Sequence, residues 1–317
     1  MWVGLEAYLG HAAGIATSLL WTATSLFFTA AARRLGTTVL NATRIALAVV
    51  LLGVTHRLFA GHWLPDANAE QVLLLALSGL IGLTIGDQAL FKSFVEIGPR
   101  TAMLIMTTSP LWAALLGWLV LGETLHAIAW FGVSLTVGGV AWVVLERPPP
   151  EAVSAGRRRF QGCALAFIAA VCQAAGLLLS KRGMGHGWLP TDQHLPPQTA
   201  TFIRMVFAGV GMVPVVIWHV RRRQRRRNDS RLPDGSRSVG LLLTCGGAIV
   251  GPYLGVWMSL VATDRAPLGI AQTLCSMSPI FLLPFAAVIQ KERISTRAIL
   301  GAVIAVAGSA LLFFQTG

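Results

Sequence analysis

Ten stretches of about 20 mostly apolar residues follow one another along the chain, and they constrain its fold more than any other feature. A helix needs about 20 apolar residues to cross the hydrocarbon core of a bilayer. Because 55% of the residues are hydrophobic and only 12% are charged, the chain has too little polar surface for a soluble globule. We therefore predict an all-α integral membrane protein with ten transmembrane helices. The stretches are 9–32, 37–58, 71–94, 101–121, 126–145, 161–179, 199–220, 239–262, 269–289 and 296–314.

Five residues of the first half recur in the second half in the same order and at the same spacing. They are Gly82, Gly86, Ser109, Pro110 and Glu123, repeated as Gly251, Gly255, Ser278, Pro279 and Glu292. Such self-similarity indicates an internal repeat. Each half contains five predicted crossings, an odd number, so the second half must enter the membrane from the opposite side. The sequence thus predicts two inverted five-helix repeats around a central cavity.

A basic, proline-rich segment separates the two predicted repeats. It contains three consecutive prolines at 148–150 and three consecutive arginines at 157–159, a composition typical of linkers. We therefore predict a first repeat at 1–146, a linker at 147–160 and a second repeat at 161–317.

The lysines and arginines are concentrated on one side of the predicted topology. Of the 25 such residues, 18 lie in the loops after the odd-numbered stretches and four in the opposite loops. Because basic loops stay in the cytoplasm, we predict a multi-pass protein of the cell (inner) membrane with both termini outside the cytoplasm. The basic run 221–227 then anchors the chain near anionic lipid. Nucleic-acid binding is disfavoured, because no aromatic residues alternate with these arginines to stack on bases.

Residues in both halves of the chain form a pattern similar to a known repeat. In the first half they are Trp21, Arg44, Ser109-Pro110, Gly122-Glu123, Gly132, Gly138 and Gly139, and in the second Arg204, Ser278-Pro279, Glu292, Gly301 and Gly308. This pattern resembles the EamA repeat of the drug/metabolite transporter superfamily, although Gln173 stands where the second half would carry its tryptophan. The resemblance implies a ten-helix transporter whose central cavity opens to alternate sides without ATP hydrolysis. Consistently, the sequence contains no GxxxxGK[ST] phosphate loop.

The two repeated prolines interrupt apolar helices. A proline inside a helix removes an amide donor and leaves the carbonyl four residues earlier without its partner, here at Met106 and Cys275. Free carbonyls are costly in hydrocarbon, so the kinks at Pro110 and Pro279 are candidates for cavity lining and for a hinge. Alternatively, each kink is static, and the preceding serine satisfies the backbone.

Asp87 is the deepest carboxylate of the predicted spans. Charged groups inside spans are expensive and are often functional, so Asp87 is the candidate for proton or cation coupling. It could also be a buried partner of Arg44 or a hydrogen-bonded packing group. Gln88 and Lys92 share one helix face, and Lys92 also reaches Glu96 one turn further along.

Four charged residues are candidates for structural ion pairs. Arg44 and Glu96 are predicted near the cytoplasmic face, and Arg204 and Asp264 near the outer face. Two pseudo-symmetric pairs would hold neighbouring helices together. The alternative is that an arginine captures a carboxylate or phosphate of the cargo, for which its planar fork is suited. Glu123, predicted outside, and Glu292, predicted inside, are candidate helix-end or gate residues.

The remaining candidates combine aromatic and amide side chains, as small-molecule sites do. No cofactor is expected, because the four cysteines lie in apolar stretches without a metal-ligand spacing. His186 and His194 share one loop but lack a third ligand, which argues against a metal site. The candidate cavity residues are Trp21, Asn41, Asp87, Gln88, Met106, Ser109, Pro110, Gln173, Tyr253, Trp257, Gln272, Ser278 and Pro279.

These features favour a secondary active or facilitative transporter that exports small metabolites, amino acids or amphipathic drugs by alternating access. Its partners would be the substrate, the lipid bilayer and, as a candidate coupling ion, protons. A non-transporting membrane receptor or a membrane-embedded enzyme is the alternative. An enzyme would need a convergent nucleophile and base or a metal cluster, and none is evident in the sequence. A receptor would be expected to carry a folded soluble domain, and the loops are short.

Overall fold

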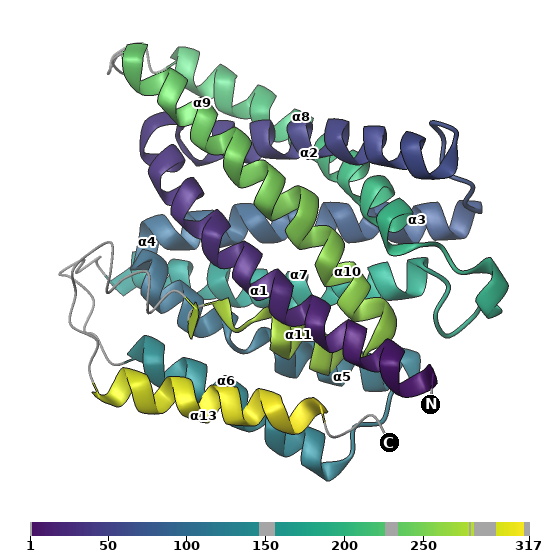
Figure 1. Ribbon diagram of the computed structural model, residues 1–317. Helices are drawn as coiled ribbons and strands as arrows, with labels where there is room; N and C mark the ends of the chain where they lie inside the picture. Colours follow the sequence, from purple (N-terminus) through teal and green to yellow (C-terminus); the bar gives the residue numbers. More distant parts are fainter. Residues whose placement is uncertain (1, 146–155, 226–233, 279, 282–295, 314–317) are drawn as a thin grey trace.

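The computed structural model describes residues 2–145, 156–225, 234–278, 280–281 and 296–313, and these residues form a bundle of helices (Figure 1). Five of the described helical stretches are long and apolar enough to cross a membrane, and three shorter apolar helices accompany them. The five are Thr38–Ala60, Ala69–Ser93, Arg158–Gly183, Pro197–Trp218 and Arg237–Arg265, and the shorter ones are Ser109–Leu121, Ala127–Trp142 and Ile299–Leu312. The all-helical membrane class agrees with the sequence, while the number of ten crossings stays a prediction.

The described parts of the two halves contain six α-helices each. The elements of the first half are α1 (Trp2–Leu35), α2 (Thr37–Ala60), α3 (Ala69–Ser78), η1 (Gly79–Gly86), α4 (Asp87–Met106), α5 (Ser109–Leu121) and α6 (Ala127–Leu145). Those of the second half are α7 (Gly156–Gly183), η2 (Thr191–Gln193), α8 (Pro197–Arg225), α9 (Asp234–Ala248), η3 (Ile249–Gly255), α10 (Val256–Arg265), α11 (Leu268–Cys275) and α13 (Thr296–Phe313).

Two π-helical segments, η1 and η3, occupy corresponding positions of the two halves. A π-helix is rare and frequently marks a functional site. The repeated glycines of these segments allow another helix to approach closely. A Cβ atom on Gly86 would lie 3.1 Å from Cβ of Cys172 on α7, and one on Gly255 would lie 2.8 Å from the Trp21 ring on α1. The repeated glycines thus have a packing role in both halves.

Each repeated Ser-Pro pair follows a complete break in the helix rather than a kink. α4 ends at Met106, a turn follows at Thr107 and Thr108, and α5 begins at Ser109 with Pro110 in its first turn. In the second half α11 ends at Cys275, before a turn at 276–277. In the first half the interruption lies where the sequence predicted it, at Pro110, but the helix is broken there rather than kinked, and Pro279 lies outside the described residues. Proline is tolerated in the first turn of a helix, where no intrahelical amide bond is needed, so the helix restarts at the Ser-Pro pair.

The third and fourth predicted stretches also differ from the observed elements. We expected a boundary between residues 94 and 101, whereas α4 runs through this segment as one helix. The interruptions lie instead at η1 and at Thr107–Thr108. Hydropathy alone places boundaries poorly here, because the backbone changes its hydrogen-bonding pattern inside apolar sequence.

The two halves of the chain interleave in space. α1 packs against α9, η3, α10 and α11, and we call these elements the α1 bundle. α7 packs against α3, η1, α4 and α5, which form the α7 bundle. α2 pairs with α8, and α6 lies beside α13 along the lower edge of Figure 1. Each bundle therefore combines one helix of one half with a run of helices from the other half.

Short loops and helix ends gather at one end of the molecule. The start of α1, the loop after α2 and the loop between α7 and α8 lie at the right of Figure 1. At the opposite end, Gly240 of α9 approaches Leu35 at the end of α1, with 2.9 Å from its added Cβ to Cγ of the leucine. Helix ends and loops thus lie at two opposite ends of the molecule, as expected for helices that cross a membrane one after another.

Candidate functional site

A partly buried ion pair between Arg44 on α2 and Asp87 on α4 forms the centre of the candidate site. The Arg44 guanidinium contacts the Asp87 carboxylate through Nη2, and its Nε donates to Oδ1 of Asn41 at 2.7 Å. The rings of Phe28 and Phe91 lie over its Cζ atom, at 5.4 and 5.3 Å from their centroids. Arg44 is only 9% exposed. Carboxylate, amide and aromatic faces together compensate for the lost hydration of this charge.

Met212 of α8 joins two further candidate residues to this centre. Asn41 donates through Nδ2 to the Met212 sulfur at 3.5 Å, and Gln88 donates to the same sulfur at 3.6 Å. A thioether is a weak acceptor and a flexible side chain. Asn41, Asp87 and Gln88 therefore lie around one point where α2, α4 and α8 meet.

Arg204 of α8 is buried close to the same centre. Its side chain is 1% exposed, its Nε has no hydrogen-bond partner, and Asp87 is the carboxylate whose charge acts on it. A Cβ atom on Gly82 would lie 2.8 Å from its Nη2 atom, and one on Gly176 would lie 3.2 Å from it. The guanidinium thus lies between η1 and α7, in space left by two glycines.

The two ion pairs expected from the sequence are not those of the structure. Arg44 pairs with Asp87, which the sequence offered as an alternative partner, rather than forming the expected pair with Glu96. Asp264 lies at the end of α10, with His186 at 2.9 Å and Arg265 at 3.9 Å, where we expected Arg204. Depth along the membrane axis was a poor guide, because side chains at one depth can still belong to helices that are not neighbours.

The break between α4 and α5 faces the second half of the chain. Ser109 is fully buried, and its hydroxyl accepts a hydrogen bond from Nε2 of Gln272 on α11 at 3.0 Å. Oε1 of Gln272 is buried without a hydrogen-bond partner among the residues that the structure describes. The two bundles therefore meet at a pair of candidate residues, one beside each helix break.

The break after α11 is satisfied by two hydroxyls of α1. Ser18 Oγ donates to the carbonyl of Leu274 and accepts from the amide of Met277 at 3.2 Å. Ser278 donates to the carbonyl of Ser18 at 3.0 Å, and Thr22 donates to the carbonyl of Ser278 at 3.1 Å. Neighbouring helices often satisfy the backbone groups that a break exposes within a membrane. Ser18 and Thr22 could not be singled out from the sequence, where they are two small polar residues within an apolar stretch.

The aromatic candidates are divided between the two sides of α10. Tyr253 hydrogen-bonds Thr55 of α2 at 2.7 Å and lies 6.1 Å from the Trp257 ring. Trp257 also contacts Phe59, at 6.2 Å between centroids. Trp21 lies on α1 and packs against Gly255 of η3. Met106 on α4 and Gln173 on α7 are half-buried.

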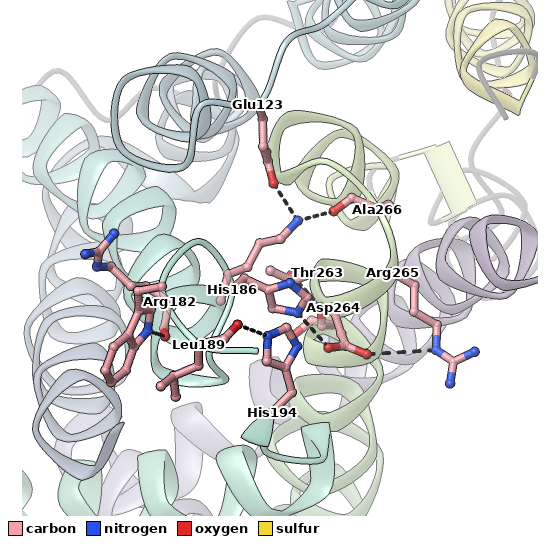
Figure 2. Close-up of polar contacts among 12 residues, drawn as sticks. Glu123, Arg182, His186, Leu189, His194, Thr263, Asp264, Arg265 and Ala266 are labelled. Atoms are coloured by element: carbon pink, nitrogen blue, oxygen red, sulfur yellow. Dashed lines mark hydrogen bonds and ion pairs between the residues drawn. The ribbon is translucent and has the colours of Figure 1, made fainter. Parts of the chain in front are cut away.

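Glu123 joins the end of α5 to two elements of the second half (Figure 2). One carboxylate oxygen binds Nζ of Lys181 at 2.5 Å, and the other accepts from the amide of Leu268 at 2.7 Å, at the start of α11. Lys181 also donates to the carbonyl of Ala266 at 2.6 Å. A carboxylate at a helix N-terminus is favoured by the helix dipole. Lys181 was missed in the sequence, where it is one basic residue at the end of an apolar stretch.

A second polar group lies beside this one, in the loop between α7 and α8. His186 contacts Asp264, and its ring lies 4.5 Å from the ring of His194, which in turn contacts the carbonyl of Leu189 at 3.2 Å (Figure 2). Among the described residues, no three potential metal ligands come together. The two groups cover the end of the molecule at which α5, α7, α10 and α11 meet.

Two candidates lie outside the described residues. They are Pro279 and Glu292, the second-half counterparts of Pro110 and Glu123. The expectation that the two prolines approach each other, and the gate role of Glu292, stay predictions.

Comparisons with known proteins concern the whole chain. The model of the EamA-like transporter family matches residues 8–145 and 160–314. A solved crystal structure superimposes with a TM-score of 0.74 at 17% sequence identity, over 95% of this chain and 94% of that chain. Among curated proteins, no match was found. The family match covers both halves separately, and the structural match establishes the fold alone.

Proposed function

The chain belongs to the EamA-like transporter family, and from this membership we propose that it is a secondary active or facilitative transporter. It exports small metabolites, amino acids or amphipathic drugs across the inner membrane by alternating access. The bilayer and a small-molecule substrate are its partners.

The observation that carries this proposal is the duplicated interruption of the helices at the contact between the two bundles. Breaks after Met106 and Cys275, and the π-segments η1 and η3, occupy matching places. Interrupted helices at a repeat interface are typical of binding sites in transporters. Because each bundle mixes helices of both halves, the rocking motion takes place between the α1 bundle and the α7 bundle, not between the two halves of the sequence.

The substrate site of this proposal lies where these bundles meet α2 and α8. Polar groups of Arg44, Asp87 and Asn41 and the amide of Gln272 supply a few hydrogen-bonding positions among apolar side chains, which is the usual composition of a ligand site. The side chains of Tyr253 and Trp257 supply aromatic surface near α2.

In this proposal, contacts between the two bundles hold the predicted outer end closed. Glu123 holds Lys181 and the start of α11 together, and Asp264 holds His186. At the same end a Cβ atom on Gly10 would lie 2.9 Å from Cβ of Arg265, so α1 and α10 are in close contact. Opening towards the outside therefore requires the Glu123–Lys181 contact to break.

Asp87 couples transport to protons through Arg44. Protonation of the carboxylate removes the negative partner of Arg44, which frees the guanidinium from α4 and changes the contact between α2 and α4. Besides Arg44, Arg204 acts on the Asp87 charge, and Lys92 lies one turn further on α4, exposed.

The Asp87→Asn variant tests this coupling in proteoliposomes loaded with a candidate substrate. Asparagine keeps the shape and can still accept from Arg44, but it cannot titrate. We expect the variant to bind substrate while its efflux no longer responds to an imposed pH gradient. Gln88→Ala, a change at the neighbouring non-titrating residue, should keep the response. A gradient response in Asp87→Asn equal to that of the wild type would rule out coupling at this residue.

A further inference from the structure

Arg204 is a buried charged residue that takes part in none of the ion pairs described above. Its side chain is 1% exposed, it forms no ion pair among the described residues, and its Nε atom is buried without a hydrogen-bond partner. Burying an unpaired charge is costly, so buried arginines normally have a carboxylate or carbonyl partner. The sequence-based partner, Asp264, is engaged with His186 at the end of the bundle.

The surroundings of the guanidinium lack side chains on two sides. Gly82 of η1 and Gly176 of α7 lie beside Nη2. A methyl group on either glycine would come too close to this atom. Their own Cα atoms are close together, since a Cβ on Gly176 would lie 3.0 Å from Cα of Gly82. Glycine at both positions therefore lets the guanidinium fit between η1 and α7, with backbone rather than side chains on these two sides.

The charges around Arg204 do not balance. Arg44 and Arg204 are both buried, and Asp87 is the one carboxylate that the structure describes near them. Asp87 forms its ion pair with Arg44. On the adjoining helix α4, Lys92 adds a further positive charge at an exposed position, and Glu96 lies more than two turns beyond Asp87. Among the described groups at this centre, one positive charge is thus in excess.

We propose that Arg204 binds the carboxylate of a transported monoanion, an inference that rests on the proposed transport function and specifies its substrate class. The planar guanidinium offers paired donors that match a carboxylate, and one added negative charge neutralises the buried excess. Met205, which follows Arg204 on α8, belongs with Met212 and Tyr253 to one apolar cluster between α2, α8 and η3. They suit the hydrocarbon part of an amphipathic organic acid.

A matched set of three probes tests the charge preference on the full-length protein in nanodiscs. 3-Phenylpropionate, its amide and 3-phenylpropylamine share a skeleton and carry charges of −1, 0 and +1 at neutral pH. By calorimetry we expect the acid to bind at least about tenfold more tightly than the amide, the scale of a hydrogen bond to a charged group. The amine should bind more weakly than both. Equal affinity for acid and amide in the wild type would overturn the proposal.

The Arg204→Met variant tests which residue is responsible. It removes the charge at similar volume and should abolish the preference for the acid, while Arg204→Lys should retain part of it. Arg57→Met, at an exposed arginine near the end of α2, should leave the preference unchanged. Because Arg204 forms no ion pair with a described residue, Arg204→Met should unfold at the same or a higher temperature than the wild type. A preference that persists in Arg204→Met, or a large loss of stability, would contradict the assignment.

Flux measurements separate this inference from the transport proposal. Equal flux of acid and amide in proteoliposomes would overturn the anion site and leave transport intact. Tight, Arg204-dependent binding of the acid without flux of any probe would support the anion site and contradict transport.

Discussion

Glu123 illustrates how one side chain can hold several elements together. It follows Gly122, whose φ of 67° ends α5 in the left-handed conformation and turns the chain back. The carboxylate then lies over Gly117, where an added Cβ would be 2.7 Å from Oε2, and reaches the start of α11. The Gly-Glu motif of the sequence therefore has a structural explanation in the first repeat, because glycine permits the turn and glutamate binds across the two bundles.

Replacing Glu123 with glutamine should destabilise the protein strongly. The Lys181 side chain is only 7% exposed, so its charge would keep the Ala266 carbonyl as a partner and lose its counter-ion. We expect a loss of about 3–5 kcal/mol in unfolding free energy, as for other broken buried pairs. Denaturant unfolding of the purified protein in detergent measures it.

The double variant Glu123→Gln/Lys181→Met provides the control. Removing both charges should recover most of the loss, because no unpaired charge then remains. Equal losses in the single and double variants would show that the ion pair is not the cause.

At the scale of elements, glycines decide which helices come together. α6 and α13 lie side by side, with Gly139 at their contact. An added Cβ there would lie 2.6 Å from both the Ala305 amide nitrogen and the Gly301 carbonyl oxygen, whereas nothing lies within 4 Å of one on Gly138. Small residues allow close helix packing within membranes, where the hydrophobic effect does not drive helices together.

Alanine at these two adjacent positions should therefore have different effects. Gly139→Ala must push α6 away from α13, and we expect a loss of about 1–3 kcal/mol, typical of overpacking. Gly138→Ala should stay within about 1 kcal/mol of the wild type, with any change in the stabilising direction because alanine favours helix. Thermal unfolding of the two variants in the same detergent compares them directly. Similar shifts for both would contradict this packing.

The positions of the helix breaks could be predicted from the sequence, but the π-segments could not. Pro110 lacks an amide hydrogen, so the break in front of it follows from one residue's chemistry. A π-turn accommodates an extra residue between otherwise regular turns, and what stabilises it is the neighbouring helix. Thr24 of α1 fits against Gly251 in η3, with 2.8 Å from an added Cβ to its hydroxyl oxygen. Such a contact is invisible until the helices are placed.

At the scale of the molecule, the two ends should face different compartments. The loop that contains Asp192 lies at the end where Glu123 binds Lys181, and Arg221 lies in the last turns of α8, whose start is at that same end. The excess of basic residues predicts that the Arg221 end is cytoplasmic.

Single cysteine substitutions test this orientation. Asp192 and Arg221 are both exposed, so Asp192→Cys and Arg221→Cys offer comparable thiols, with wild-type labelling as the background of the native cysteines. A membrane-impermeant maleimide should label Asp192→Cys in intact cells and Arg221→Cys only after permeabilisation. The reverse pattern would invert the predicted topology.

The sequence by itself determined the membrane class, the duplication, the helix breaks and the family, because each follows from hydropathy or from residues at fixed spacing along the chain. It also supplied the charged residues of the centre. Only the tertiary structure decided their partners. Arg44 binds Asp87 rather than Glu96, and Arg204 has no ion pair among the described residues, because the two halves interleave and bring α2, α4 and α8 to one place. Pairing depends on which helices are neighbours, and spacing along the chain does not contain that information.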